Sequence, residues 1–158
     1  MSQTAEFTAG EWLTLQLSPF WVLSSVTGTY RDFDPRDLET FADAVESAAR
    51  APGVVGREVF ACVLQDLDGL RHAYVADGRT IAGGLCAVSD ALAKVPVAEA
   101  QLFRSMLVDG VGADVARARG PYGRTMTAED KQALELLTQL VAEGPRCCTI
   151  RVGAAWAR

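Results

Sequence analysis

Residues 31–37 read RDFDPRD and residues 124–130 read RTMTAED, so one layout occurs at two distant points of the chain. In each stretch a residue that favours the N-cap of a helix, Asp34 or Thr127, is followed three positions later by an aspartate. An N-cap side chain accepts a hydrogen bond from the first helical turn, and a carboxylate three residues later can bond back to the N–H of the cap. Both stretches therefore predict the start of a helix.

The similarity continues into the helices that these stretches open. When Asp34 is aligned with Thr127, apolar residues fall on apolar residues: Phe33 on Met126, Phe41 on Leu134, Ala44 on Leu137 and Ala48 on Val141. An internal echo of this kind indicates a fold built from two related halves. We predict an all-α fold, a single-domain helical bundle of about six to seven helices. Its two pseudo-symmetric halves are joined by helices between residues 57 and 95.

The strongest helical patterns lie between residues 35 and 120. Apolar side chains recur there every three or four residues, which is the spacing of one helix face. This spacing predicts a helix that begins at Pro35 and is ended by Ala51-Pro52-Gly53, and further helices across residues 59–74, across residues 81–95 and from Pro96 to Gly120. Glycines at positions 83 and 84 weaken the third of these helices, and they indicate that another backbone approaches it closely.

Both ends of the chain carry their own signals. Ser18-Pro19 has the form of a cap followed by proline, and it predicts a helix start, with a shorter helix ahead of it at residues 12–17. Near the other end, apolar and polar residues alternate from Cys148 to Val152, which is typical of extended chain. We therefore divide the chain into a helical bundle domain, residues 1–144, and a C-terminal tail, residues 145–158, which docks on the body or on a partner.

The composition is that of a globular protein. Of the 158 residues, 49% are hydrophobic and 22% are charged, and the net charge is −5. Nucleic-acid binders usually carry a basic stripe, so this balance argues against a nucleic-acid partner. No stretch resembles a signal peptide or is long enough to span a membrane. Cys62 and Cys86 fall within helical patterns as free thiols, and we expect a cytoplasmic protein.

Several common catalytic arrangements are missing from the sequence. His72 is the one histidine, which excludes metal sites built on two histidines and leaves a single candidate base for a serine or cysteine nucleophile. It falls on the polar side of its predicted helix, where a solvated histidine is expected. No phosphate-binding loop and no pair of C-x-x-C motifs is present. We therefore lean towards a protein that is not an enzyme and requires no cofactor.

The acidic turn is the best candidate for a binding site. Asp32, Asp34 and Asp37 offer three carboxylates to a hard cation such as Ca²⁺ or Mg²⁺. Helix capping is the other explanation for Asp34 and Asp37, and it leaves the role of Asp32 open. In the second stretch Thr125 takes the place of Asp32, which makes that stretch a weaker cation site.

Adjacent cysteines in the tail are a second candidate. Arg146 and Arg151 flank Cys147 and Cys148, and nearby positive charge lowers the pKa of a thiol and makes it more reactive. The alternative is a chain terminus that carries two incidental thiols.

Two units, each with an acidic turn and a capped helix, resemble the tellurite-resistance TerB-like family. The resemblance rests on residues 30–38 in the first half and residues 120–130 in the second. It implies an all-helical bundle with pseudo-twofold halves and acidic surface patches that bind divalent metal. It also implies a role in stress response, or as an adaptor within a larger assembly.

Three hypotheses follow from these patterns. The leading one is a non-enzymatic helical binding or adaptor module of TerB-like type, which acts through a protein partner or self-association and holds a cation at Asp32, Asp34 and Asp37. The first alternative is a subunit of an obligate oligomer that uses the tail or the helix of Gly83 and Gly84 as its interface. The second alternative is an enzyme that uses a tail cysteine.

Overall fold

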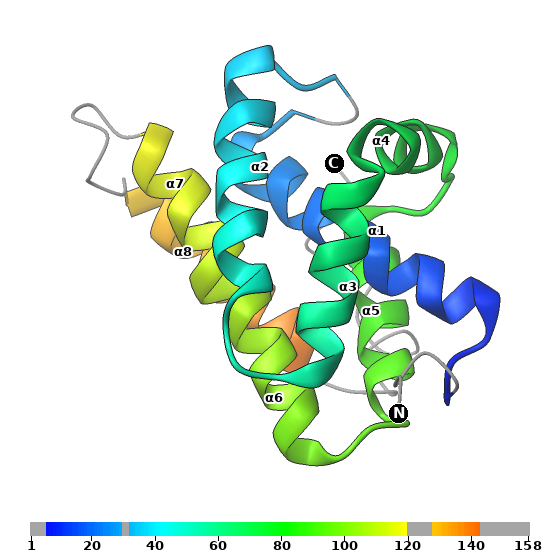
Figure 1. Ribbon diagram of the computed structural model, residues 1–158. Helices are drawn as coiled ribbons and strands as arrows, with labels where there is room; N and C mark the ends of the chain where they lie inside the picture. The colour runs from blue at the N-terminus through cyan, green and yellow to red at the C-terminus, as the bar shows by residue number, and fades with distance from the viewer. Residues whose placement is uncertain (1–5, 30–31, 120–127, 143–158) are drawn as a thin grey trace.

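The computed structural model describes residues 6–29, 32–119 and 128–142. The fold is all-α, and none of these residues lies in a strand (Figure 1). The elements in chain order are α1 (Ala9–Thr27), α2 (Pro35–Ala49), α3 (Val54–Gln65), α4 (Leu67–Ala76), α5 (Ile81–Leu92), α6 (Val97–Ser105), the π-helix η2 (Met106–Gly112), α7 (Ala113–Arg119) and α8 (Ala128–Ala142).

Helix α1 forms the centre of the fold. It is apolar on nearly all sides, as expected for a helix surrounded by others, and 12 of its 19 residues are buried. It packs against α2, α3, α4, α5, α7, α8 and η2. In Figure 1, α2 and α3 lie side by side in front of it. One hydrophobic cluster takes residues from every described helix, so these helices share a single core.

Helix α1 runs without interruption through Pro19, so the prediction of a helix start at Ser18-Pro19 is wrong. Proline has no N–H, and inside a helix it leaves the carbonyl four residues earlier without its usual donor. That carbonyl belongs to Leu15, and the Ser18 hydroxyl donates to it at 2.6 Å. Serine thus replaces the bond that Pro19 removes, which allows one long helix where the pattern indicated two.

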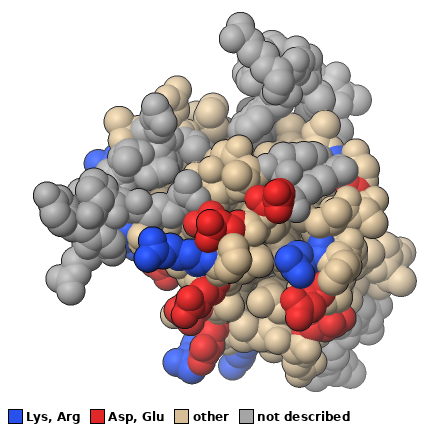
Figure 2. Space-filling model, turned by 90° about the horizontal axis from the view of Figure 1, so that it is seen from above, with Lys and Arg blue, Asp and Glu red and all other residues tan. Residues whose placement is uncertain are grey.

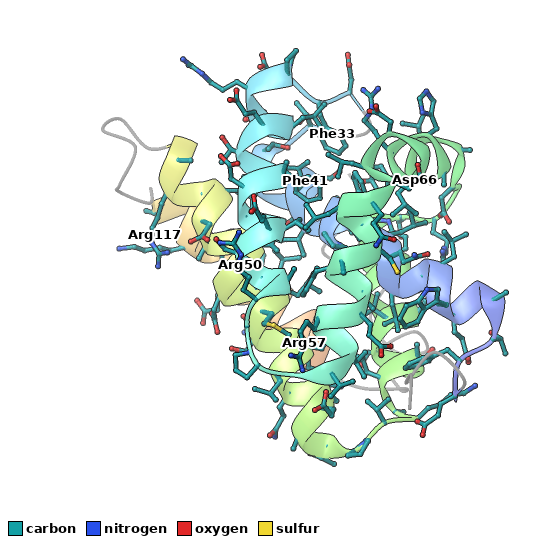
Figure 3. The ribbon with its side chains drawn as sticks, in the orientation of Figure 1. Phe33, Phe41, Arg50, Arg57, Asp66 and Arg117 are labelled. Carbon is teal, nitrogen blue, oxygen red and sulfur yellow. The ribbon has the colours of Figure 1, made fainter. Side chains whose placement is uncertain are left out.

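The predicted helix across residues 59–74 is two helices, α3 and α4, which meet at Asp66. Asp66 leaves the helical conformation with φ −138° and ψ 52°, and its carboxylate accepts a hydrogen bond from the N–H of Gly69 at 3.2 Å. A Cβ at position 69 would lie 2.4 Å from the carboxylate oxygens, so the Asp66 side chain would have to shift if residue 69 carried one. Figure 3 shows Asp66 at the elbow between the two helices.

The predicted helix from Pro96 to Gly120 begins as expected, because Pro96 is the N-cap of α6. Its middle differs from the prediction, since Met106–Gly112 forms the π-helix η2 before α7 resumes α-helical geometry. Helices α1, α2, α6, α7 and α8 surround η2, and five of its seven residues are buried. The spacing of apolar residues predicts one buried helix face. It therefore does not reveal a segment that is buried on several sides.

The glycines of α5 explain its close packing on α1. A Cβ at Gly84 would lie 2.2 Å from the indole ring of Trp21. The predicted close approach is therefore real, but its partner is a side chain of the same chain rather than another backbone. Gly84 is buried against α1, which places it inside the protein and not on a surface open to a second subunit.

Helix α2 begins at Pro35, as the sequence predicts, and ends at Ala49, just before the predicted stop at Ala51-Pro52-Gly53. The similarity between the two stretches extends to burial at the two aligned pairs for which it is described. Phe41 and Leu134 are both buried, as are Ala44 and Leu137. The pseudo-symmetry of the halves stays a prediction, because the turn at residues 124–127 lies outside the described residues. The tail with Cys147 and Cys148 lies outside them as well. No described helix has the length and apolar character needed to cross a membrane.

Candidate functional site

The acidic turn before α2 is held in place by Phe33. This ring is buried and stacks on the ring of Tyr74 from α4, with 5.8 Å between centroids. The Tyr74 hydroxyl in turn shares a hydrogen bond of 2.5 Å with the hydroxyl of Ser24 on α1. Figure 3 shows Phe33 and Phe41 on the side of α2 that faces the core. A buried residue just before an N-cap fixes the angle at which the chain enters the helix.

Asp34 is the N-cap of α2, as predicted. Its carboxylate accepts a hydrogen bond from the N–H of Arg36 at 2.8 Å, and Pro35 occupies the first helical position. This bond satisfies one of the N–H groups that a helix leaves open at its start. The negative charge also lies at the positive end of the helix dipole, where it is favourable.

The structure does not gather the three predicted cation ligands at one point. In the described part of the chain, no three His, Cys, Asp or Glu side chains are arranged to hold a metal ion. Asp32 is exposed and makes no hydrogen bond or ion pair with another described residue, while Asp37 is partly buried. The carboxylate of Asp34 caps the helix, and the cation site at Asp32, Asp34 and Asp37 stays a prediction.

The outer side of α2 carries what we call the acidic stripe, Glu39, Asp43 and Glu46. All three side chains are exposed, at intervals of four and three residues, on the side of the helix away from its buried residues. Glu46 forms an ion pair with Arg50 at 2.5 Å, and both of these side chains remain largely exposed to water. Glu39 and Asp43 make no ion pair or hydrogen bond among the residues that the structure describes.

Most of the net charge of the chain lies in α2 and the residues that flank it. Residues 32–50 contain six acidic side chains and two arginines, which gives −4 for this segment against −5 for the whole chain. Figure 2 looks onto the end of the molecule where α2 begins, and carboxylates gather near the middle of that face with basic side chains between them. The field around α2 therefore favours the approach of positively charged groups.

His72 is a surface residue, as predicted. It is exposed on α4, and its Nδ1 lies 2.7 Å from the carbonyl oxygen of Asp68 one turn earlier. Of the cysteines predicted to lie within helices, Cys86 is buried and Cys62 is partly buried. The candidate thiol site at Cys147 and Cys148 cannot be compared with the structure, since both lie outside the described residues.

A capping box at the start of α1 was not predicted from the sequence. The Thr8 hydroxyl accepts from the N–H of Glu11 at 3.2 Å, and the Glu11 carboxylate accepts from the N–H of Thr8 at 2.9 Å. The same carboxylate binds the ammonium group of Lys94 at 2.7 Å, and that hydrogen bond lowers the pKa of Glu11 from its usual value of 4.5. The pattern Thr-x-x-Glu at residues 8–11 is the signal that predicts this box.

A long-range cap at the start of α3 was also missed. Gly53 precedes this helix and has no side chain to cap it, and its φ of +116° suits glycine. The carboxylate of Glu99 on α6 takes over that role, because it accepts from the N–H of Val54 at 2.9 Å and from that of Val55 at 3.3 Å. No local pattern indicates a cap supplied from 45 residues away.

Comparison with known proteins finds a relative of similar sequence. The chain is 35% identical over 106 residues to the uncharacterized protein ORF11' of Methanothermobacter thermautotrophicus, an alignment that covers 64% of this chain and 70% of that protein. The chain belongs to the ORF11' family. No family model and no solved structure matches it. The function of this ORF11' family member is therefore inferred from its own geometry.

Proposed function

We propose that this protein is a non-enzymatic helical binding module of TerB-like type, and that a basic segment of a protein partner binds to the acidic stripe of α2. The observation that carries the proposal is the exposed row Glu39, Asp43 and Glu46 on a helix whose opposite side is fixed in the core. A rigid helix presents the three carboxylates in a constant arrangement, as a recognition surface requires.

The stripe does little for the fold itself. Glu39 and Asp43 are one turn apart, and like charges at this spacing destabilise a helix by about 0.2–0.5 kcal/mol. Neither has a compensating ion pair among the described residues, and the pair of Glu46 with Arg50 is so exposed that water screens it. Complementary charge on a partner would remove the repulsion and would speed association at low salt.

A charge-neutral variant tests this proposal. We expect Glu39→Gln/Asp43→Asn/Glu46→Gln to lose partners that the native protein retains from an extract of its own cells, as identified by cross-linking and mass spectrometry. Titration of an identified partner should then show an affinity that falls as salt is raised, because the interaction is electrostatic.

The matched control removes the same number of exposed carboxylates elsewhere. Glu6→Gln/Asp90→Asn/Glu135→Gln changes net charge equally, at three exposed positions on other parts of the surface. This control should retain the partners. If both triple variants bind alike, general charge rather than the stripe governs binding, and the proposal fails.

The cation at Asp32, Asp34 and Asp37 is the second part of the proposal. Isothermal titration of the native protein with Ca²⁺ and with Mg²⁺ should give a heat of binding that is absent from Asp32→Asn. The substitution replaces a charged carboxylate with a neutral amide, which removes one negative charge from the site. Asp32 serves as the test position because Asp34 is engaged in capping. If the native protein gives no heat of binding, the turn does not bind these cations and helix capping is its remaining role.

A role in stress response belongs to the TerB-like part of the proposal. A strain lacking the gene should then grow more slowly than its parent in tellurite-containing medium, and a gene copy with the neutralised stripe should fail to restore growth. If that copy restores growth, the role in stress response does not depend on the acidic stripe.

A further inference from the structure

We draw no further inference here: the strongest candidate, the exposed apolar side chains of Val97 at the start of α6 and Leu136 on α8, two helices that pack against each other, carries nothing because nothing in the structure shows what covers them.

Discussion

Pro19 lies in the middle of the central helix α1, where a proline normally interrupts hydrogen bonding. The helix continues because its neighbour supplies the missing donor, from the Ser18 hydroxyl to the Leu15 carbonyl. All three residues are buried, so water cannot replace this bond. One hydroxyl thus decides whether the central helix tolerates its proline.

Ser18→Ala should destabilise the protein by about 1–3 kcal/mol, because it leaves a buried carbonyl without a donor. Chemical denaturation measures this loss. In a Pro19→Ala background the N–H of the new alanine can bond Leu15, so the same serine substitution should cost much less. Equal costs in the two backgrounds would show that the hydroxyl does not substitute for the missing N–H.

Two glycines in helices should respond oppositely to the same substitution. Gly84→Ala should destabilise by about 1–3 kcal/mol, since the added Cβ would meet the buried ring of Trp21. Gly10→Ala adds the same group where nothing lies within 4 Å, and better helix propensity should stabilise α1 by up to about 1 kcal/mol. Thermal unfolding of both variants checks the pair, and a neutral Gly84→Ala would mean that α5 can move away from α1.

At the scale of the elements, helix ends are tied together by side chains from distant parts of the chain. Glu99 on α6 caps α3, and Lys94 beyond the end of α5 binds the capping carboxylate Glu11 of α1. Glu99 satisfies N–H groups that the local sequence of α3 leaves open, and Lys94 pairs with a carboxylate that already caps α1. The arrangement of the helices therefore depends on these polar contacts as well as on the hydrophobic core.

Glu99→Ala should cost about 1–2 kcal/mol, because two N–H groups at the start of α3 lose their acceptor. Glu99→Gln retains an acceptor oxygen but not the charge that interacts with the helix dipole, so its loss should be smaller. Amide hydrogen exchange at Val54 and Val55 should quicken in the alanine variant. Unchanged exchange there would argue against this cap.

The contact of Glu11 with Lys94 should make stability depend on pH. Since this contact lowers the pKa of Glu11 in the folded state, its stabilisation is complete above the ordinary glutamate pKa and is lost as pH falls through the lowered value. Native protein should therefore exceed Glu11→Gln in urea midpoint at about pH 7, and the difference should shrink towards about pH 3.

Lys94→Gln is the control for that experiment. In the native background it should lower the urea midpoint at neutral pH, whereas in the Glu11→Gln background it should have little effect, because the pair is already broken. Additive effects of the two substitutions would contradict the coupling.

At the scale of the whole molecule, the regular part of the fold could be predicted from the sequence and the exceptions could not. Amphipathic spacing and the Asp34-Pro35 pair predicted α2 correctly, because its inside and outside differ sharply. The cap-and-proline signal failed at Pro19, where the outcome depends on a single hydroxyl. Apolar spacing failed at Asp66 and at η2, where it depends on a single carboxylate and on packing from several sides. The candidate cation site was read from neighbouring carboxylates, but proximity in sequence does not show where side chains point.

Because one core takes residues from every described helix, the bundle should unfold in a single cooperative transition. Far-UV circular dichroism and tryptophan fluorescence should give the same denaturation midpoint. Fluorescence reports the surroundings of the three tryptophans, which include buried Trp21, while the dichroism reports all helices. Two separated midpoints would divide the described helices into independently stable parts.

The carboxylate of Glu99 also has a consequence for the order of synthesis. The ribosome completes residues 54 and 55 well before it adds the residue that accepts their hydrogen bonds. A nascent chain that stops short of position 99 therefore carries the whole of α3 with an uncapped first turn. The first turn of α3 is capped only after α6 has emerged from the ribosome. In the middle of this protein a later segment therefore completes an earlier one.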